Sequence, residues 1–215
     1  MNWASLFEMA ARVARSPLAG ELVLRGSVPM RLWFGDRARR PGDVDYVVAD
    51  AYIEAHSPDG DAIMDGLTRV LGPPESESDL WADGEAIGRR LGYPGGRIDV
   101  VFGEILWAEP EILPVNGVPV PAASPTLELA WKLRWLEGGH PEPKDLYDAV
   151  LLAESPRVDL ELSRGVFEAV WRDDFVELPP RWSEHAPADD RWRAAGLPGR
   201  PGEWIDRLNA ACGLE

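Results

Sequence analysis

The spacing of apolar and polar residues in the first half of the chain switches between the two-residue period of strands and the longer period of amphipathic helices. Short runs rich in Val, Leu and Ile and bounded by turn residues predict strands at Glu21–Arg25, Val44–Val48 and Arg97–Phe102. Apolar residues at helical spacing predict helices at Met1–Arg15, Val28–Phe34 and Asp61–Leu71. Both kinds of element therefore alternate in this half.

Turn-forming residues separate these elements. Asn116-Gly117 predicts a hairpin turn within Ile105–Val120, because this pair favours the tight turns that join antiparallel strands. The segment Gly72–Asp79 and the basic segment Gly35–Gly42 contain the Gly and Pro residues that are typical of loops.

Helical spacing dominates after residue 122. Ser124-Pro125 is a typical helix start, with a capping serine followed by proline at the first helical position. We expect helices at Thr126–Leu136, Lys144–Glu154, Asp159–Asp173 and Glu203–Ala211. The segment Leu178–Gly202 is rich in Pro, Arg, Asp and Trp and is expected to be irregular.

The expected fold class is α+β. Residues 1–122 are predicted to form a core with a small mixed β-sheet flanked by helices. Residues 123–215 are predicted to form a mostly helical half that closes one side of a cleft. The boundary between the two is placed near Pro119–Ser124.

Composition and charge narrow the class of protein. The 215 residues include 22 Lys and Arg against 37 Asp and Glu, a net charge of −15, which argues against a generic basic nucleic-acid coat. The single cysteine, Cys212, excludes a disulfide framework within one chain and is consistent with a cytoplasmic location. No apolar run of about 18 residues occurs, so we expect no membrane span.

Three carboxylates carry the main chemical signal. Asp43 and Asp45 are two residues apart on a predicted strand, so both project from the same face. Asp99 lies on a second predicted strand, and pairing of the two strands would bring three carboxylates together. Mg²⁺ prefers such oxygen ligands together with phosphates, and the cluster suits metal-assisted phosphoryl or nucleotidyl transfer.

Gly26-Ser27 supplies a second signal, at the turn from a predicted strand into a predicted helix. A glycine at this turn lets backbone N–H groups approach a phosphate closely, and the helix N-terminus favours negative charge. The hydroxyl of Ser27 can donate to a phosphate oxygen.

The order Gly26-Ser27, Asp43-Val44-Asp45 and Asp99 resembles the pattern of the polymerase-β-like nucleotidyltransferase superfamily. Within it, the chain resembles the AbiEii/AbiGii toxin family over residues 21–154. Ala130-Trp131-Lys132-Leu133 is similar to one further family element. Lys144-Asp145-Leu146-Tyr147-Asp148 is similar to another, with Lys in place of Arg. The segment Arg39–Asp43 departs from the family pattern because it lacks a serine.

The resemblance implies a role for each site residue. Gly26 and Ser27 position a triphosphate, and Asp43, Asp45 and Asp99 bind the metal, with Asp99 also assisting deprotonation of the acceptor. Lys132 neutralises charge on the phosphates and Asp145 orients the nucleotide or Lys132. Asp148 and Arg40 are further candidates for nucleotide binding, and Arg39 for contacts to phosphate or acceptor.

Each of these residues also has a structural interpretation. Asp43 and Asp45 could be solvated acids on an exposed strand, and Asp99 could pair with Arg97 at spacing i, i+2. Gly26-Ser27 could be only a turn, and Lys132 could form a surface pair with Glu128. Asp145 could have only a favourable interaction with the helix dipole, and Arg39 and Arg40 could belong to a solvated loop.

The leading functional prediction is an NTP-dependent enzyme that uses Mg²⁺ or Mn²⁺ to transfer NMP to an acceptor hydroxyl. The family resemblance implies an RNA or tRNA 3′ end as acceptor and a cognate antitoxin protein as partner in a bacterial toxin–antitoxin or phage-defence system. One alternative is the same chemistry on a small hydroxylated molecule such as an aminoglycoside, which the acidic charge would suit. Another is a non-catalytic module that binds a nucleotide or a partner protein.

Overall fold

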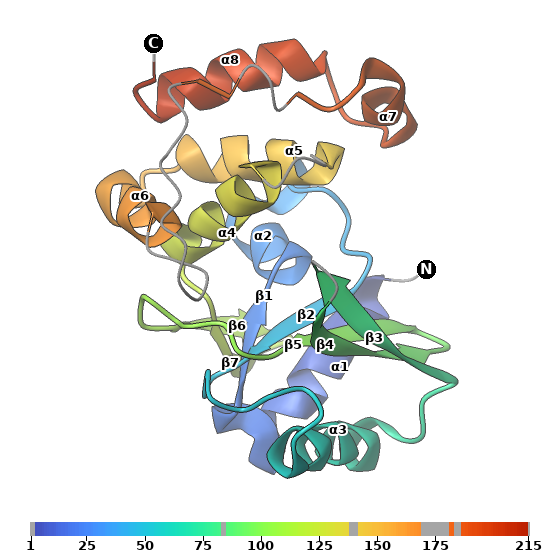
Figure 1. The fold of residues 1–215 in the computed structure, drawn as a ribbon. Coiled ribbons are helices and arrows are strands. Elements are labelled where there is room, and N and C mark those ends of the chain that lie inside the picture. The colour runs from blue at the N-terminus through green and yellow to red at the C-terminus, as the bar shows by residue number, and fades with distance from the viewer. Residues whose placement is uncertain (1–2, 83–84, 138–141, 169–180, 183–185, 215) are drawn as a thin grey trace. The chain divides into compact units, whose positions relative to one another are not determined.

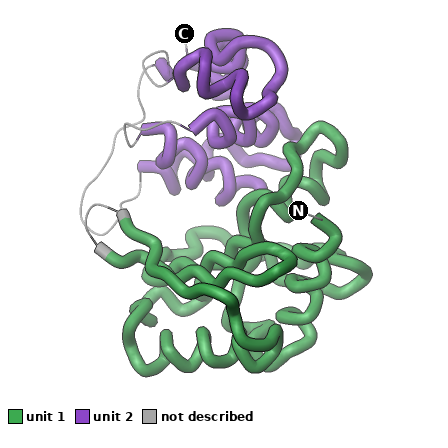
Figure 2. The backbone as a smooth tube through the Cα atoms, turned by 90° about the vertical axis from the view of Figure 1, so that its right-hand side faces the viewer, with its two compact units in different colours: residues 1–123 green, residues 124–215 purple. Residues whose placement is uncertain are grey.

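Two compact units, residues 1–123 and 124–215, divide the chain in the computed structural model of the protein (Figure 2). The structure describes residues 3–82, 85–137, 142–168, 181–182 and 186–214. Unit 1 contains the β-sheet and unit 2 is helical.

Unit 1 is built on a seven-stranded mixed sheet with the strand order β3-β4-β5-β2-β1-β7-β6 (Figure 1). Its strands are β1 (Leu22–Arg25), β2 (Val44–Val48), β3 (Ser76–Ala82), β4 (Glu85–Tyr93), β5 (Gly96–Val101), β6 (Glu111–Val115) and β7 (Val118–Ala122). The pairs β2–β5 and β1–β7 are parallel, and the other neighbours are antiparallel. The predicted α+β class with a mixed sheet is confirmed.

The core of unit 1 lies between one face of the sheet and two helices, α1 (Trp3–Ala14) and α3 (Pro58–Leu71). Side chains alternate along β2, so Val44, Tyr46 and Val48 join this core while Asp45 points to the other face. Helix α2 (Ser27–Phe34) lies on the opposite side of the sheet from α1 and α3 (Figure 1). The polar positions of β2 and β5 therefore face the side of the sheet that carries α2.

Two local predictions in unit 1 have different outcomes. The hairpin turn at Asn116-Gly117 is confirmed, because both residues have positive φ (49° and 76°) and join β6 to β7. The loop predicted at Gly72–Asp79 is wrong from Ser76 onward, where β3 begins. Strand β3 is held by antiparallel pairing to β4, a long-range interaction that local turn composition does not report.

Unit 2 contains five helices in its described residues: α4 (Pro125–Glu137), α5 (Pro143–Ala153), α6 (Leu160–Glu168), α7 (Asp189–Ala194) and α8 (Pro201–Ala211). The predicted cap at the start of α4 is confirmed, since Ser124 Oγ accepts a hydrogen bond of 3.3 Å from the backbone N–H of Leu127. Residues 169–173 of the helix predicted at Asp159–Asp173 lie outside the described residues.

Aromatic side chains form much of the interior of unit 2. The Trp204 ring lies 4.5 Å from the Tyr147 ring and 5.8 Å from the Trp192 ring, measured between centroids. Trp192 belongs to α7, so the prediction of an irregular Leu178–Gly202 is wrong over Asp189–Ala194. Burial of this tryptophan, only 1% exposed, stabilises a six-residue helix that its polar sequence alone does not indicate.

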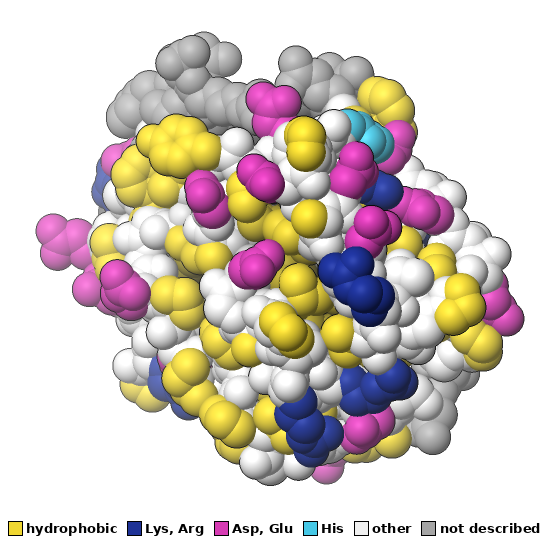
Figure 3. Space-filling model, turned by 90° about the horizontal axis from the view of Figure 1, so that it is seen from below, with side chains coloured by type: hydrophobic (Ala, Val, Ile, Leu, Met, Phe, Trp, Pro, Cys, Tyr) yellow, Lys and Arg dark blue, Asp and Glu magenta, His cyan; other side chains and the backbone are white. Residues whose placement is uncertain are grey.

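On the face of the molecule seen from below, acidic side chains are scattered over much of the view, whereas most of the basic side chains lie toward its lower right (Figure 3). In the described part of the chain, no helix is long and apolar enough to cross a membrane.

Truncation of Leu24 tests the importance of the central strand. Leu24 is fully buried on β1, between β2 and β7. We expect Leu24→Ala to lower the free energy of unfolding by about 2–5 kcal/mol, because a cavity is added to the lost apolar burial. Urea denaturation measures the loss. Ile112→Ala is the control, because Ile112 lies on the edge strand β6 and is 62% exposed; it should change the free energy of unfolding by less than about 1 kcal/mol. Equal losses in the two variants would contradict this expectation.

Candidate active site

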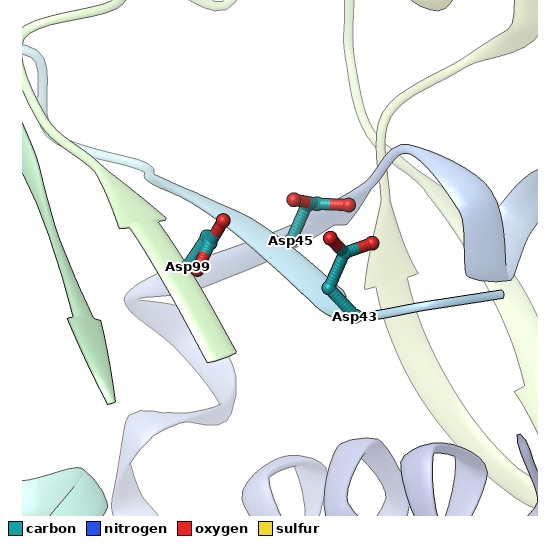
Figure 4. A group of neighbouring side chains, drawn as sticks. All are labelled: Asp43, Asp45 and Asp99. Carbon is teal, nitrogen blue, oxygen red and sulfur yellow. The ribbon is translucent and has the colours of Figure 1, made fainter. Parts of the chain in front are cut away.

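Strands β2 and β5 bring the three predicted carboxylates together. The two strands are parallel, and Asp45 lies directly opposite Asp99 in their register. Asp43 precedes the first residue of β2 and projects to the same side as Asp45 (Figure 4). One carboxylate oxygen from each residue lies within 4.8 Å of the other two. The sequence prediction that Asp99 joins the paired acids in space is confirmed.

The three acids are enclosed to different degrees. Asp99 is 7% exposed, whereas Asp43 and Asp45 are half-buried. Like charges at this separation repel each other, and partial exclusion of water strengthens the repulsion. The interpretation of solvated acids on an exposed strand therefore does not apply, and the cluster needs cations nearby.

Two arginines provide part of that positive charge. Arg90 on β4 donates two hydrogen bonds, of 2.7 and 2.6 Å, to the two carboxylate oxygens of Asp99. Arg97 on β5 donates to Asp43, and its Nε lies 3.9 Å from Asp99 Oδ2. The hydrogen bond to Asp99 raises the pKa of Arg90 against the effect of partial burial, and the negative charges of Asp99, Asp43 and Asp45 raise it further.

The register of the sheet places these charges in a row. Arg25, Asp45, Asp99 and Arg90 occupy directly opposed positions on β1, β2, β5 and β4. Arg25 is 8% exposed and forms an ion pair with the equally buried Glu104. Two arginines thus flank two aspartates across four neighbouring strands.

Gly26 and Ser27 form the turn between β1 and α2, beside Asp45 and Asp43. Gly26 has φ of 74° and ψ of −136°, a conformation that other residues adopt only with strain. A Cβ atom at this position would lie 2.5 Å from Asp45 Oδ2. The Ser27 hydroxyl is fully buried, 3.4 Å from the Asp43 carboxylate. Glycine is therefore required here both by the backbone and by the close approach of a carboxylate.

A second group of predicted residues lies within unit 2. Lys132 on α4 donates a 2.9 Å hydrogen bond to Asp145 on α5, and its Nζ lies 3.7 Å from Asp148 Oδ2. All three side chains are buried, as is Glu128. The alternative of a surface Glu128–Lys132 pair is therefore wrong. Burial of such charges is costly unless they are paired. Pairing with Lys132 is therefore a stronger reason for an acid at position 145 than an interaction with the helix dipole.

The remaining predicted residues are less enclosed. Arg40 is exposed and Arg39 half-buried, in the segment between the short 3₁₀ helix η2 (Gly35–Arg37) and β2. The structure thus gathers Gly26, Ser27 and the three aspartates in unit 1, and Lys132, Asp145 and Asp148 in unit 2.

Sequence reasoning missed Arg90. It lies on β4, which was not predicted because Gly88 and Gly92 interrupt the apolar alternation of that strand. The sequence indicated Arg97 only as a partner of Asp99, because the two residues are two positions apart on one strand and so share a face. Its bond to Asp43 follows from strand register instead.

The acid cluster fits a divalent cation. It offers one ligand atom from each of three carboxylates, within reach of one another, and a glycine turn beside them for a phosphate. An all-oxygen donor set matches the preference of Mg²⁺ or Mn²⁺.

Solved structures with a similar fold are nucleotidyltransferase-like proteins. A putative nucleotidyltransferase from Helicobacter pylori is similar over 99% of this chain and 92% of its own, with 14% identity and a TM-score of 0.54. JHP933 from Helicobacter pylori is similar over 100% of this chain and 92% of its own, with 14% identity and a TM-score of 0.52. A search of curated protein sequences found no match. The fold is that of a nucleotidyltransferase.

The family is shown by the sequence itself. Residues 9–197 match the model of the nucleotidyl transferase AbiEii toxin family, of a type IV toxin–antitoxin system. The chain belongs to this family, and the resemblance inferred from its motifs is confirmed. It is a nucleotidyltransferase, so the alternative of a non-catalytic module is not favoured.

Substitution of Gly26 tests the turn. We expect Gly26→Ala to lower the free energy of unfolding by about 1–3 kcal/mol, because alanine is strained at this φ and ψ. It should also weaken Mn²⁺ binding, because the added Cβ displaces Asp45. Thermal denaturation and calorimetric titration measure the two effects. Gly20→Ala is the control, since a Cβ there meets no atom within 4 Å, and wild-type Mn²⁺ affinity in Gly26→Ala would contradict the account.

Substitution of Lys132 tests the buried charge group of unit 2. Lys132→Met leaves Asp145 and Asp148 buried without this cation, so we expect a loss of about 3–5 kcal/mol in the free energy of unfolding. The double variant Lys132→Met/Asp145→Asn should recover part of that loss, because one buried charge is removed with its partner. Lys144→Met, at an exposed position of α5, serves as the control. A Lys132→Met protein as stable as this control would exclude a paired, buried lysine.

Proposed function

We propose that this AbiEii-family nucleotidyltransferase transfers NMP from an NTP to the 3′ hydroxyl of an RNA, with tRNA as the leading candidate, in a reaction that depends on Mg²⁺ or Mn²⁺. Its biological role would be that of the toxin of a bacterial toxin–antitoxin or phage-defence pair, with an antitoxin protein as partner. The observation that carries the proposal is the cluster of Asp43, Asp45 and Asp99 beside the glycine turn.

The residues of unit 1 have distinct roles in this proposal. Asp43, Asp45 and Asp99 would hold the divalent cation, which when bound supplies charge neutralisation for the phosphates and lowers the pKa of the attacking hydroxyl. Backbone N–H groups at the start of α2 would donate to phosphate oxygens, and Ser27, whose buried hydroxyl lies 3.4 Å from the Asp43 carboxylate, would hold this turn beside the acids. The close fit of Gly26 against Asp45 keeps the phosphate-binding turn adjacent to the carboxylates.

The bond changes follow from this arrangement. The acceptor oxygen forms a bond to the α-phosphorus of the NTP, and the bond from that phosphorus to the bridging oxygen of pyrophosphate breaks. The hydroxyl proton passes toward Asp99. Arg90 donates to both oxygens of Asp99, and the lone pairs that these two hydrogen bonds leave free are the ones that would accept the proton.

The roles of the residues in unit 2 rest on the family resemblance. Lys132 would neutralise charge on the triphosphate, and Asp145, which accepts its hydrogen bond, would orient it. Asp148 would contribute to the same group. Arg39 and Arg40, on the segment that precedes Asp43, would contact phosphate or the acceptor RNA.

A transfer assay tests the proposal. Purified protein, Mg²⁺ and each labelled NTP are incubated with total RNA, and labelled RNA is separated on a gel. We expect incorporation by the wild type and a fall of about a hundredfold or more in Asp45→Asn, since a lost metal ligand removes several kcal/mol of transition-state stabilisation. Asp50→Asn, an exposed acid just after β2, is the matched control. Absence of labelled RNA with every NTP would contradict the proposal.

A small polycation is the second candidate acceptor. The net charge of −15 favours a cationic partner over a polyanion. The same assay with an aminoglycoside in place of RNA distinguishes the two: labelled drug without labelled RNA would favour the small molecule.

A further inference from the structure

Arg90 and Arg97 bind the carboxylates that the proposed reaction assigns to a metal ion. Arg90 donates to both oxygens of Asp99 at 2.7 and 2.6 Å, and Arg97 donates to Asp43. Both arginines lie on strands that neighbour the acids in the sheet, so the pairing is built into the register. Asp99 and Asp43 are therefore each paired with an arginine in the protein alone.

A divalent cation bound among these acids would be repelled by the two guanidinium groups, because all of these groups are positively charged. A carboxylate has lone pairs beyond those that a bidentate arginine uses, so an ion could still reach Asp99 geometrically. The positive charge of Arg90, held within hydrogen-bond distance of the same carboxylate, opposes its approach. The arginines and the ion thus compete for the same negative charge.

The two side chains are able to leave the acids. The side chain of Arg90 is 37% exposed and that of Arg97 is 42% exposed. Their flexible stems allow the guanidinium groups to turn into water while the strands stay in register. Arg25, which also borders the acids, differs because it is buried and paired with Glu104.

We propose that Arg90 and Arg97 are exchangeable counter-ions: they hold the three carboxylates together in the metal-free protein and are displaced when a divalent cation binds. This inference rests on the metal-dependent function proposed above. It assigns the two arginines a positioning role. They stabilise the arrangement of the acids in the metal-free protein, and they lower its affinity for the divalent cation.

Calorimetric titration of the full chain with Mn²⁺, in the absence of NTP and acceptor, tests the exchange. We expect Arg90→Gln and Arg97→Gln each to bind Mn²⁺ about tenfold more tightly than the wild type, because one competing charge is lost from a partly screened site. In EDTA both variants should melt at a lower temperature than the wild type. Added Mn²⁺ should raise the melting temperatures of both variants by more than it raises that of the wild type, since tighter binding to the folded state stabilises that state further.

The neighbouring arginine provides a matched control. Arg89 also lies on β4 and donates to Glu77 and Asp61, outside the acid cluster. Arg89→Gln therefore removes an arginine with two acidic partners from the same strand and should leave the Mn²⁺ affinity unchanged. Asp45→Asn in the Arg90→Gln background should abolish the tightened binding, which locates the ion at the cluster.

The outcomes separate this inference from the proposed function. Unchanged or weaker Mn²⁺ binding in Arg90→Gln and Arg97→Gln, with native circular dichroism, would overturn the exchange even if the enzyme transfers nucleotides. Tight binding that survives Asp45→Asn, or no binding by any variant, would overturn it as well. Tightened binding in a protein that labels neither RNA nor drug would support the exchange and contradict only the proposed function.

Discussion

Repulsion among three carboxylates is the constraint around which unit 1 is organised. Their ligand atoms lie within 4.8 Å of one another, on the face of the sheet opposite the α1–α3 core. Strand alternation makes this possible, since the same strand that buries Val44 and Tyr46 presents Asp45 on its other side. The surrounding features, including the flanking arginines and the glycine turn, allow negative charge to persist where water is partly excluded.

Unit 2 meets a similar constraint in a different way. There Asp145 and Asp148 lie on α5 and both contact Lys132, a buried cation on α4. Its side chain is 10% exposed, against 37% for Arg90, so the lysine is the more enclosed of the two cations. An enclosed ion pair maintains a fixed arrangement, whereas a half-exposed one permits exchange of partners. This chain thus combines an enclosed charge group in unit 2 with a more exposed one in unit 1.

The elements that local pattern specifies were predictable from the sequence. The turn at Gly26, the acids on β2 and β5 and the Asn116-Gly117 hairpin all have signals within a few residues. Strands β3 and β4 had no such local signal, because β4 is held by pairing with β3 on one side and β5 on the other. Arg90 was missed for the same reason: its partner is set by register across a strand whose glycines obscure its pattern. Burial of Lys132 was also unpredictable, since its acidic partners lie on the next helix.

The strand order also determines when the site can form during folding. Strands β2 and β5 are adjacent in the sheet, yet β3 and β4 separate them in the sequence. Contacts between such distant segments form slowly, because a long loop must close before they are gained. A nascent chain that ends before β5 carries Asp43 and Asp45 but lacks both Asp99 and Arg97. The three-carboxylate cluster therefore assembles only after β5 has been synthesised, and a chain interrupted before β5 contains two of its three acids.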